Sequence, residues 1–188
     1  SLEVFVADAP NHGANTCVGT YAGQYVSTGT ANTFMGSGAG NGVDGTRLTG
    51  DFNTAIGGDA GNALQGAATC NTLIGQTAGV AITTGTHNVA IGALALNECE
   101  DGTNNVIIGY SAAQHAGDGS TDIVTPTYCV AIGNNVRLSN TGVANEIVIG
   151  NEAVGQGNNT VTLGDDNVTA VYMAEDSGAT VHCLDVKP

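Results

Sequence analysis

Acidic side chains are the residues of this sequence whose pairing would be easiest to recognise as catalytic. Glycoside hydrolysis needs one carboxyl group as an acid and a second as a base or nucleophile, about 5 to 10 Å apart. The candidates are Asp59, Glu98, Glu100, Asp101, Asp118, Asp122, Asp165 and Asp166, and none stands out from a solvated turn. The chain also has only five Tyr and three Phe from which aromatic sugar platforms could be built. We therefore predict that the protein is not an enzyme.

A serine nucleophile and a phosphate-binding loop are also poorly supported. The segment Met35-Gly36-Ser37-Gly38 is superficially similar to Gly-x-Ser-x-Gly, the strand-turn-helix motif that exposes a catalytic serine. No helix is expected after it, because Ser37 lies in a glycine-rich corner of a repeat. The other glycine-rich segments lack a following helix too, so they do not resemble loops that bind phosphate at a helix N-terminus.

The five cysteines and four histidines do not form a metal motif. There is no Cys-x-x-Cys pair, so a zinc site is not expected, and the histidines are scattered. Two interpretations of the cysteines stay open: small buried apolar residues, or disulfides between neighbouring loops or chains. Cys183 is the best candidate for a link between chains. We predict no cofactor; a structural Ca²⁺ held by surface carboxylates is the one ion that the acidity would favour.

The charge of the chain excludes two classes of partner. Three Lys plus Arg stand against 17 Asp plus Glu, which gives a net charge of −14. Phosphate backbones and anionic membranes repel such a protein, so we expect no nucleic acid partner. No run of about 20 apolar residues is present, and membrane insertion is not expected. The sequence has no basic segment followed by an apolar stretch, so we do not expect a signal peptide.

A nine-fold repeat gives the strongest prediction about the fold. Short apolar boxes such as NTCVG, NTAIG and NVIIG each close on a glycine, and these glycines recur mostly at steps near 17 residues. They are Gly19, Gly36, Gly57, Gly75, Gly92, Gly109, Gly133, Gly150 and Gly164. Self-similarity at this period is typical of stacked repeat architectures. We predict an all-β fold, a parallel β-solenoid or β-roll with one strand per repeat.

The alternation within each box predicts which side chains are buried. Positions two and four lie on one face of a strand. Position two is Thr, Val or Ile, and position four is aliphatic or Met throughout, so we expect this face to form the core. Its members include Ile56, Ile74, Ile91, Ile108, Ile132 and Ile149. Three residues after most closing glycines stands an alanine, which suggests that chains meet closely along a common axis, as in a homotrimer.

The boxes also carry a resemblance to known proteins. The sequence Asn53-Thr54-Ala55-Ile56-Gly57, followed by Ala60-Gly61, resembles the repeats of bacteriophage tail fibres and of trimeric autotransporter adhesin heads. The resemblance covers about residues 15–172 and implies parallel β trimers. Residues 158–178 resemble the stretch that precedes a self-cleaving chaperone domain in some phage fibres. The period near 17 residues is longer than the adhesin spacing.

The resemblance implies a structural and adhesive function, carried by loops on a rigid scaffold. We expect an N-terminal strand or connector in residues 1–14, a solenoid domain in 15–172 and a C-terminal segment in 173–188. The expected location is a virion or the cell surface and extracellular space. The expected partners are the chain itself, as a homotrimer, and a host-surface glycan or protein receptor. The longest insertions, 41–52 and 114–128, supply the candidate binding residues Asp44, Arg47, His115, Asp118, Asp122 and Tyr128.

Three other functions remain as alternatives. The apolar ends of the chain favour a self-assembling extracellular filament or a cell-surface adhesin, because sheet ends are templates for strand addition. A polysaccharide-degrading tailspike is less favoured for lack of a recognisable acid pair. An ice-binding solenoid would use Thr16, Thr33, Thr54 and Thr72, but the expected burial of position two argues against it.

Overall fold

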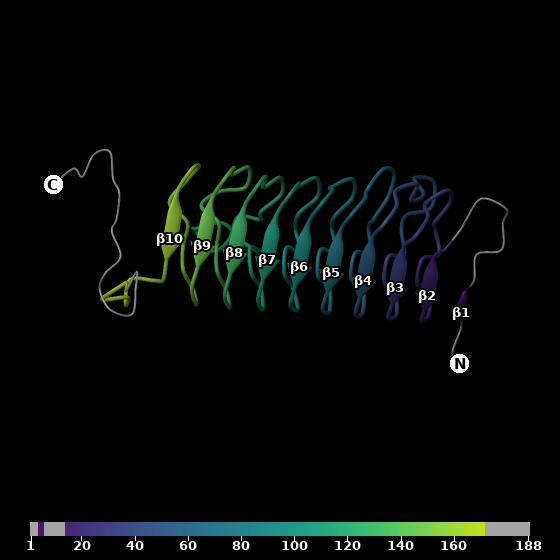
Figure 1. Cartoon of the computed structure of the whole chain (residues 1–188), viewed down its shortest axis with the longest axis horizontal. Helices are drawn as coiled ribbons and strands as arrows, with labels where there is room; N and C mark the ends of the chain where they lie inside the picture. The colour runs from purple at the N-terminus through teal and green to yellow at the C-terminus, as the bar shows by residue number, and fades with distance from the viewer. Residues whose placement is uncertain (1–3, 6–13, 172–188) are drawn as a thin grey trace, which may run out of the picture.

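The computed structural model describes residues 4–5 and 14–171, and it shows a β-solenoid (Figure 1). One ten-stranded sheet runs in chain order from β1 to β10. Strand β1 pairs antiparallel with β2, and β2 to β10 are parallel and in register. The prediction of a parallel, all-β repeat fold is confirmed. The strands are β1 Val4–Phe5, β2 Thr16–Val18, β3 Thr33–Met35, β4 Thr54–Ile56, β5 Thr72–Ile74, β6 Val89–Ile91, β7 Val106–Ile108, β8 Val130–Ile132, β9 Ile147–Ile149 and β10 Val161–Leu163.

The glycine that closes each box is required by the turn that ends each strand. From Gly19 to Gly150 these glycines have φ between +129° and +144°, a backbone conformation that side chains disfavour. They also stack closely on one another. A Cβ atom added to Gly75 would lie 2.5 Å from the carbonyl oxygen of Gly92 in the next coil. The glycine column therefore fixes both the turn and the close approach of successive coils.

The buried face of the sheet is the opposite of the one predicted. The middle residue of each strand from β2 to β9 points into the coil, and positions two and four face outward. Ile56, Ile74, Ile91, Ile108 and Ile132 are only half-buried in the single chain, and Ile149 is exposed. The inward residues are Cys17, Phe34, Ala55, Leu73, Ala90, Ile107, Ala131 and Val148. The period of two was right, but the face was wrong.

The reason for that error is a ladder of buried asparagines at position one. This position lies on the same side of the strand as position three, and a run of polar residues argues against burial. Each amide is nevertheless paired with its neighbour in the next coil. Asn71 donates from its backbone N–H and from its side chain to Oδ1 of Asn53, at 3.1 and 3.0 Å. Its amide also donates to the carbonyl of Gly85 at 2.8 Å.

The ladder includes Asn32, Asn53, Asn71, Asn88 and Asn105, all fully buried, and it ends at β8. There Cys129 takes the place of the asparagine and donates its backbone N–H to Oδ1 of Asn105 at 2.9 Å. In the next coil the position is Glu146, also fully buried. Its two carboxylate oxygens accept backbone N–H groups of Ser139 and Gly157, at 2.9 and 2.7 Å. These hydrogen bonds satisfy the buried polar groups, which would otherwise destabilise the core.

The alanine column lies inside the coil rather than between chains. Ala39, Ala60, Ala78 and Ala95 are fully buried and belong to the same core as the inward strand residues. The argument for a trimer from these alanines is therefore wrong, because the small side chains are needed where the corner folds back over the strand. Gly40 is similarly constrained, since a Cβ there would lie 2.4 Å from the Phe34 ring. Both features come from the narrow cross-section of one coil.

The N-terminal end of the solenoid has an antiparallel strand on its edge. Strand β1 covers the outer edge of β2, with Phe5 opposite Cys17. The predicted C-terminal segment 173–188, with Cys183, lies outside the described residues. Over residues 4–5 and 14–171, no helix is long and apolar enough to cross a membrane.

Candidate functional site

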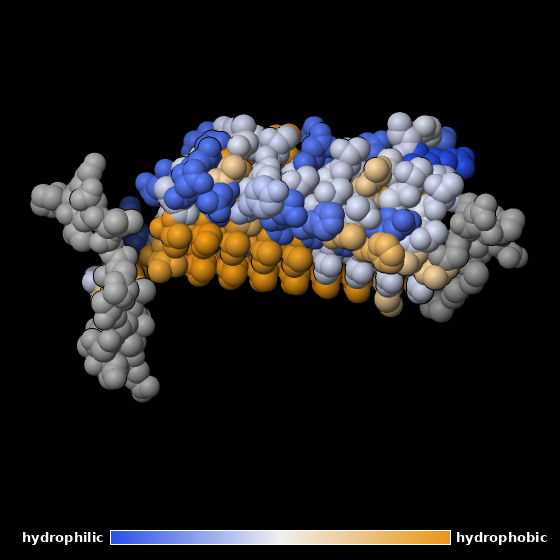
Figure 2. Space-filling view, turned by 45° about the horizontal axis from the view of Figure 1, so that its top comes forward, coloured by the Kyte–Doolittle hydropathy of each residue, from blue (hydrophilic) through white to orange (hydrophobic). Residues whose placement is uncertain are grey.

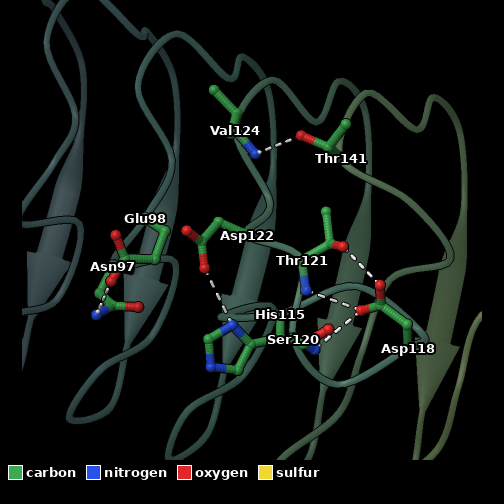
Figure 3. A network of polar contacts seen from close by, with 9 residues as sticks. All are labelled: Asn97, Glu98, His115, Asp118, Ser120, Thr121, Asp122, Val124 and Thr141. Carbon is green, nitrogen blue, oxygen red and sulfur yellow. Dashed lines mark hydrogen bonds and ion pairs between the residues drawn. The ribbon is translucent and has the colours of Figure 1, made fainter.

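The insertion after β7 forms an ordered projection on the side of the solenoid (Figure 3). His115 and Asp122 pair across its base, where they form an antiparallel bridge and their side chains meet at 3.2 Å. The backbone N–H of Ala116 donates to the carbonyl of Thr121 at 2.6 Å. Ala116 also forms a parallel bridge with Leu138 of the following coil. Thus the projection is held to the solenoid by backbone pairing rather than by side chains alone.

The tip of this projection is closed by Asp118. Its Oδ1 accepts the backbone N–H groups of Ser120 and Thr121, at 2.9 and 2.8 Å, and its Oδ2 accepts the Thr121 hydroxyl at 2.5 Å. These hydrogen bonds, with that of the Thr121 hydroxyl first, lower the pKa of Asp118 to about 2. The side chain is exposed and remains a carboxylate at neutral pH. Its role in the isolated chain is to hold the turn.

A groove of about 300 Å³ lies beside the projection. Two of its charged groups, Arg137 and Glu152, come from the corners that follow β8 and β9. The guanidinium of Arg137 lies close to the projection, since a Cβ added to Gly119 would be 2.9 Å from its Nη1 atom. The groove is lined by Ser111, Gln114, His115, Gly119, Asn135, Arg137 and Glu152. A second hollow, of about 680 Å³, continues past Arg137 and Glu152 towards β10.

The structure brings together only half of the predicted binding residues. His115, Asp118 and Asp122 belong to the projection, and His115 also lines the groove. Asp44 and Arg47 are exposed on the turn between β3 and β4, four coils from β7. At a strand spacing of about 4.8 Å this separates them by roughly 19 Å along the solenoid. Tyr128 precedes β8 and therefore lies at the opposite end of the strand from the groove.

Sequence reasoning missed most of the groove residues. Arg137 occupies the fourth position after a closing glycine, where Gly23, Gly40 and Gly61 stand in earlier coils. Those glycines have positive φ, whereas Arg137 lies in extended backbone that pairs with Val154. A charged residue in a glycine column was a usable signal, because its long side chain cannot fit into the narrow coil. Glu152 and Asn135 gave no comparable signal, as they belong to a column of ordinary turn residues.

Three of the carboxylates that were considered as acid or base candidates have lowered pKa values. Hydrogen bonds from Thr84 and then Thr83 lower the pKa of Asp101, and the side chain of Asn167 lowers that of Asp165. With Asp118, three of the predicted candidates are thus shifted towards the charged form, whereas a general acid must retain its proton.

Metal-binding and disulfide chemistry are also limited in the described part of the chain. It contains no group of three or more His, Cys, Asp or Glu side chains that could hold a metal ion. Cys17, Cys99 and Cys129 are buried free thiols, and Cys70 is an exposed free thiol. Burial raises the pKa of Cys99 to about 12, so this thiol is unreactive at neutral pH. Cys183 lies outside the described residues, and its predicted role remains a prediction.

The outer face of the sheet carries a row of partly exposed apolar side chains. Its two columns are position two and position four of every box, and they form a band along one side of the molecule (Figure 2). Exposed fractions reach 43% at Met35 and 63% at Val161. The first column is Thr16, Thr33, Thr54, Thr72, Val89, Val106, Val130, Ile147 and Val161; the second is Val18, Met35, Ile56, Ile74, Ile91, Ile108, Ile132, Ile149 and Leu163. We call this surface the outer sheet face.

In comparisons with protein-family models, curated proteins and solved structures, the chain has no significant match.

Proposed function

We propose that this chain is a non-enzymatic, adhesive fibre module that assembles as a homotrimer and displays its side loops to a host surface. The observation that carries the proposal is the outer sheet face, whose second column is apolar in all nine strands from β2 to β10 and whose first column is apolar from β6 to β10, in register throughout. A continuous apolar surface on a protein with a net charge of −14 is a feature of interaction sites rather than of free surface.

A second copy of the chain is the partner that fits this face best. The face is straight, it extends along the whole solenoid, and it carries two side-chain columns of equal length. Three such faces packed around a common axis would bury both columns along the length of each chain. The sequence resemblance to trimeric fibres and adhesin heads supports the same arrangement. The exposed polar loops would then point away from the axis.

The loops would act by multiplicity. A trimer presents three copies of the projection at 114–123 and of the turn that bears Asp44 and Arg47. Weak contacts of one loop with a receptor gain avidity when the copies engage together on a rigid support. The backbone pairing of Ala116 with Leu138 provides that rigidity at the projection. Such a module would act on a virion or at a cell surface, which is the location that we propose.

Light scattering over a concentration series tests the assembly. The fibre module should have a constant mass of about 56 kDa, three times the 18.6 kDa of one chain. A monomer at all concentrations would contradict the proposal. Polymers that grow with concentration would favour a filament, in which the end of the stack at β10 adds the next subunit. Host attachment by the intact trimer, compared with a trimer that lacks residues 117–121, tests the adhesive part.

Ice binding is a second candidate, because position two, which was expected to be buried, faces outward in the structure. Thr16, Thr33, Thr54 and Thr72 are stacked in register and face outward. A flat, regular threonine column is a plausible template for ordered water. The column changes to Val and Ile from β6 onward, which is why we favour a protein partner. Measurement of thermal hysteresis separates the two, since an adhesive module should leave the freezing point of the solution unchanged.

A further inference from the structure

The groove between the projection and the corners after β8 and β9 combines opposite hydrogen-bonding groups in one place. The guanidinium of Arg137 can only donate, the carboxylate of Glu152 can only accept, and the side chains of Gln114, Asn135 and Ser111 can do both. No hydrogen bond or ion pair of the Arg137 or Glu152 side chain is formed within residues 14–171. Both charged groups are therefore available to a ligand.

The backbone explains why these groups remain available. Arg137 is fixed between two coils, since its N–H donates to the carbonyl of Ala153 and its carbonyl accepts the N–H of Gly155, both at 2.9 Å. The corner at Glu152 is fixed in the same way, by donation from its N–H to the carbonyl of Asn134 at 2.8 Å. Their separation is thus set by the solenoid. The backbone of the groove is therefore fixed before a ligand binds, and only side chains have to be ordered on binding.

We infer that this groove binds a neutral saccharide, and this inference rests on the adhesive function proposed above. Sugar hydroxyl groups donate and accept at the same time, so a pair of them can receive hydrogen bonds from a guanidinium and give them to a carboxylate. The side-chain amides of Gln114 and Asn135 can complete the set. A volume of about 300 Å³ suits one or two sugar rings. The second hollow extends the same groove for a longer chain.

The charge of the site favours a neutral sugar over an acidic one. The single positive charge of Arg137 is balanced by Glu152 in the groove, and Asp122 faces His115 at its edge. The chain as a whole carries a net charge of −14, which repels a carboxylated sugar as it approaches. A neutral saccharide gains the hydrogen bonds without that penalty.

The test is saturation-transfer NMR and calorimetry on the full chain with lactose, maltose, cellobiose and N,N′-diacetylchitobiose, and with 3′-sialyllactose as the acidic probe. At least one neutral disaccharide should bind with a millimolar Kd. Arg137→Ala and Glu152→Gln should each weaken binding about 10-fold or more, because each removes a charged hydrogen-bonding partner. Gln76→Ala, which removes an exposed hydrogen-bonding side chain from the corner after β5 and outside the groove, should leave the Kd unchanged.

The inference is overturned if no neutral disaccharide binds at about 10 mM, if Arg137→Ala and Glu152→Gln bind as well as the parent, or if only sialyllactose binds. Failure of the fibre proposal looks different. If the chain binds a disaccharide through Arg137 but stays monomeric in light scattering, the saccharide inference stands and the fibre proposal is contradicted. If the groove variants form a 56-kDa trimer that still attaches to cells, the fibre proposal stands and the groove is not the site of attachment.

Discussion

The coils from β2 to β5 differ from those from β6 to β10 both inside and outside the solenoid. The first group has threonine in the outer column, and its buried position one is asparagine in β3, β4 and β5. The second group has Val or Ile in the outer column; its buried position one is still asparagine before β6 and β7, and becomes Cys129 before β8 and Glu146 before β9. The backbone register is the same in both. The glycine column and the inward-pointing middle position therefore define the coil, while the other positions vary with what they contact.

The largest effect is expected from breaking the ladder in its middle. Asn88→Ala should lower the free energy of unfolding by about 2 to 6 kcal/mol, because it leaves the Gly102 carbonyl and the Asn105 N–H buried without partners. Chemical denaturation monitored by circular dichroism measures the loss. If the variant unfolds like the parent, the ladder is not a source of stability.

The introduction of an asparagine where the ladder ends tests the reverse change. Cys129→Asn extends the ladder into β8, where the new amide would meet Oδ1 of Asn105 and the Val143 carbonyl. We expect a gain of about 1 kcal/mol, the usual net value of one hydrogen bond. A loss would show that the C-terminal coils have adapted to the sulfur atom.

A pair of substitutions in one strand tests which face is buried. Ile107→Ala should lower the free energy of unfolding by about 2 to 5 kcal/mol, since its side chain is fully buried in the core. Ile108→Ala, its outward neighbour, should cost clearly less when measured on the monomeric chain. Denaturation at low protein concentration gives both values, and equal losses would contradict the assignment of the faces.

Converting the C-terminal outer column to the N-terminal type tests the proposed interface. The triple variant Val89→Thr, Val106→Thr and Val130→Thr keeps the side-chain shape but buries three hydroxyl groups per chain. Each buried hydroxyl group costs about 1 kcal/mol or more, so the dissociation constant of the trimer should increase at least about 100-fold. Sedimentation velocity measures this change. Thr54→Val, the opposite exchange in the first group, serves as the control and should tighten assembly.

The smallest effect concerns the turn at Asp118. Its pKa is lowered to about 2, so its contribution to the turn is complete above the ordinary carboxyl pKa, near 4, and is lost as the pH falls through about 2. An NMR titration of the Asp118 carboxyl and of the Ser120 and Thr121 amides should show one transition with that midpoint. A midpoint near 4 would mean that the hydrogen bonds do not hold the turn in solution.

The fold could be predicted from the sequence because a repeat multiplies a weak signal. One NTAIG box says little, but nine boxes that each close on a glycine define strand, turn and register together. The buried face could not be predicted, because an asparagine without a known partner is expected to lie at the surface. Only the preceding coil supplies Asn53, the partner that makes Asn71 tolerable in a core. The groove was missed for the same reason, as Ser111, Arg137 and Glu152 meet only after coiling.

The constant register has a consequence for how such a chain changes in length. Every coil from β2 to β9 offers its neighbour a closing glycine, an inward-pointing middle position and a strand edge in the same register, so a whole repeat gained or lost by recombination leaves two compatible ends. Each event would alter the rod by about 4.8 Å, one strand spacing. The number of repeats in the gene therefore sets the length of the solenoid, and the distance of the loops from their point of attachment can evolve in fixed steps.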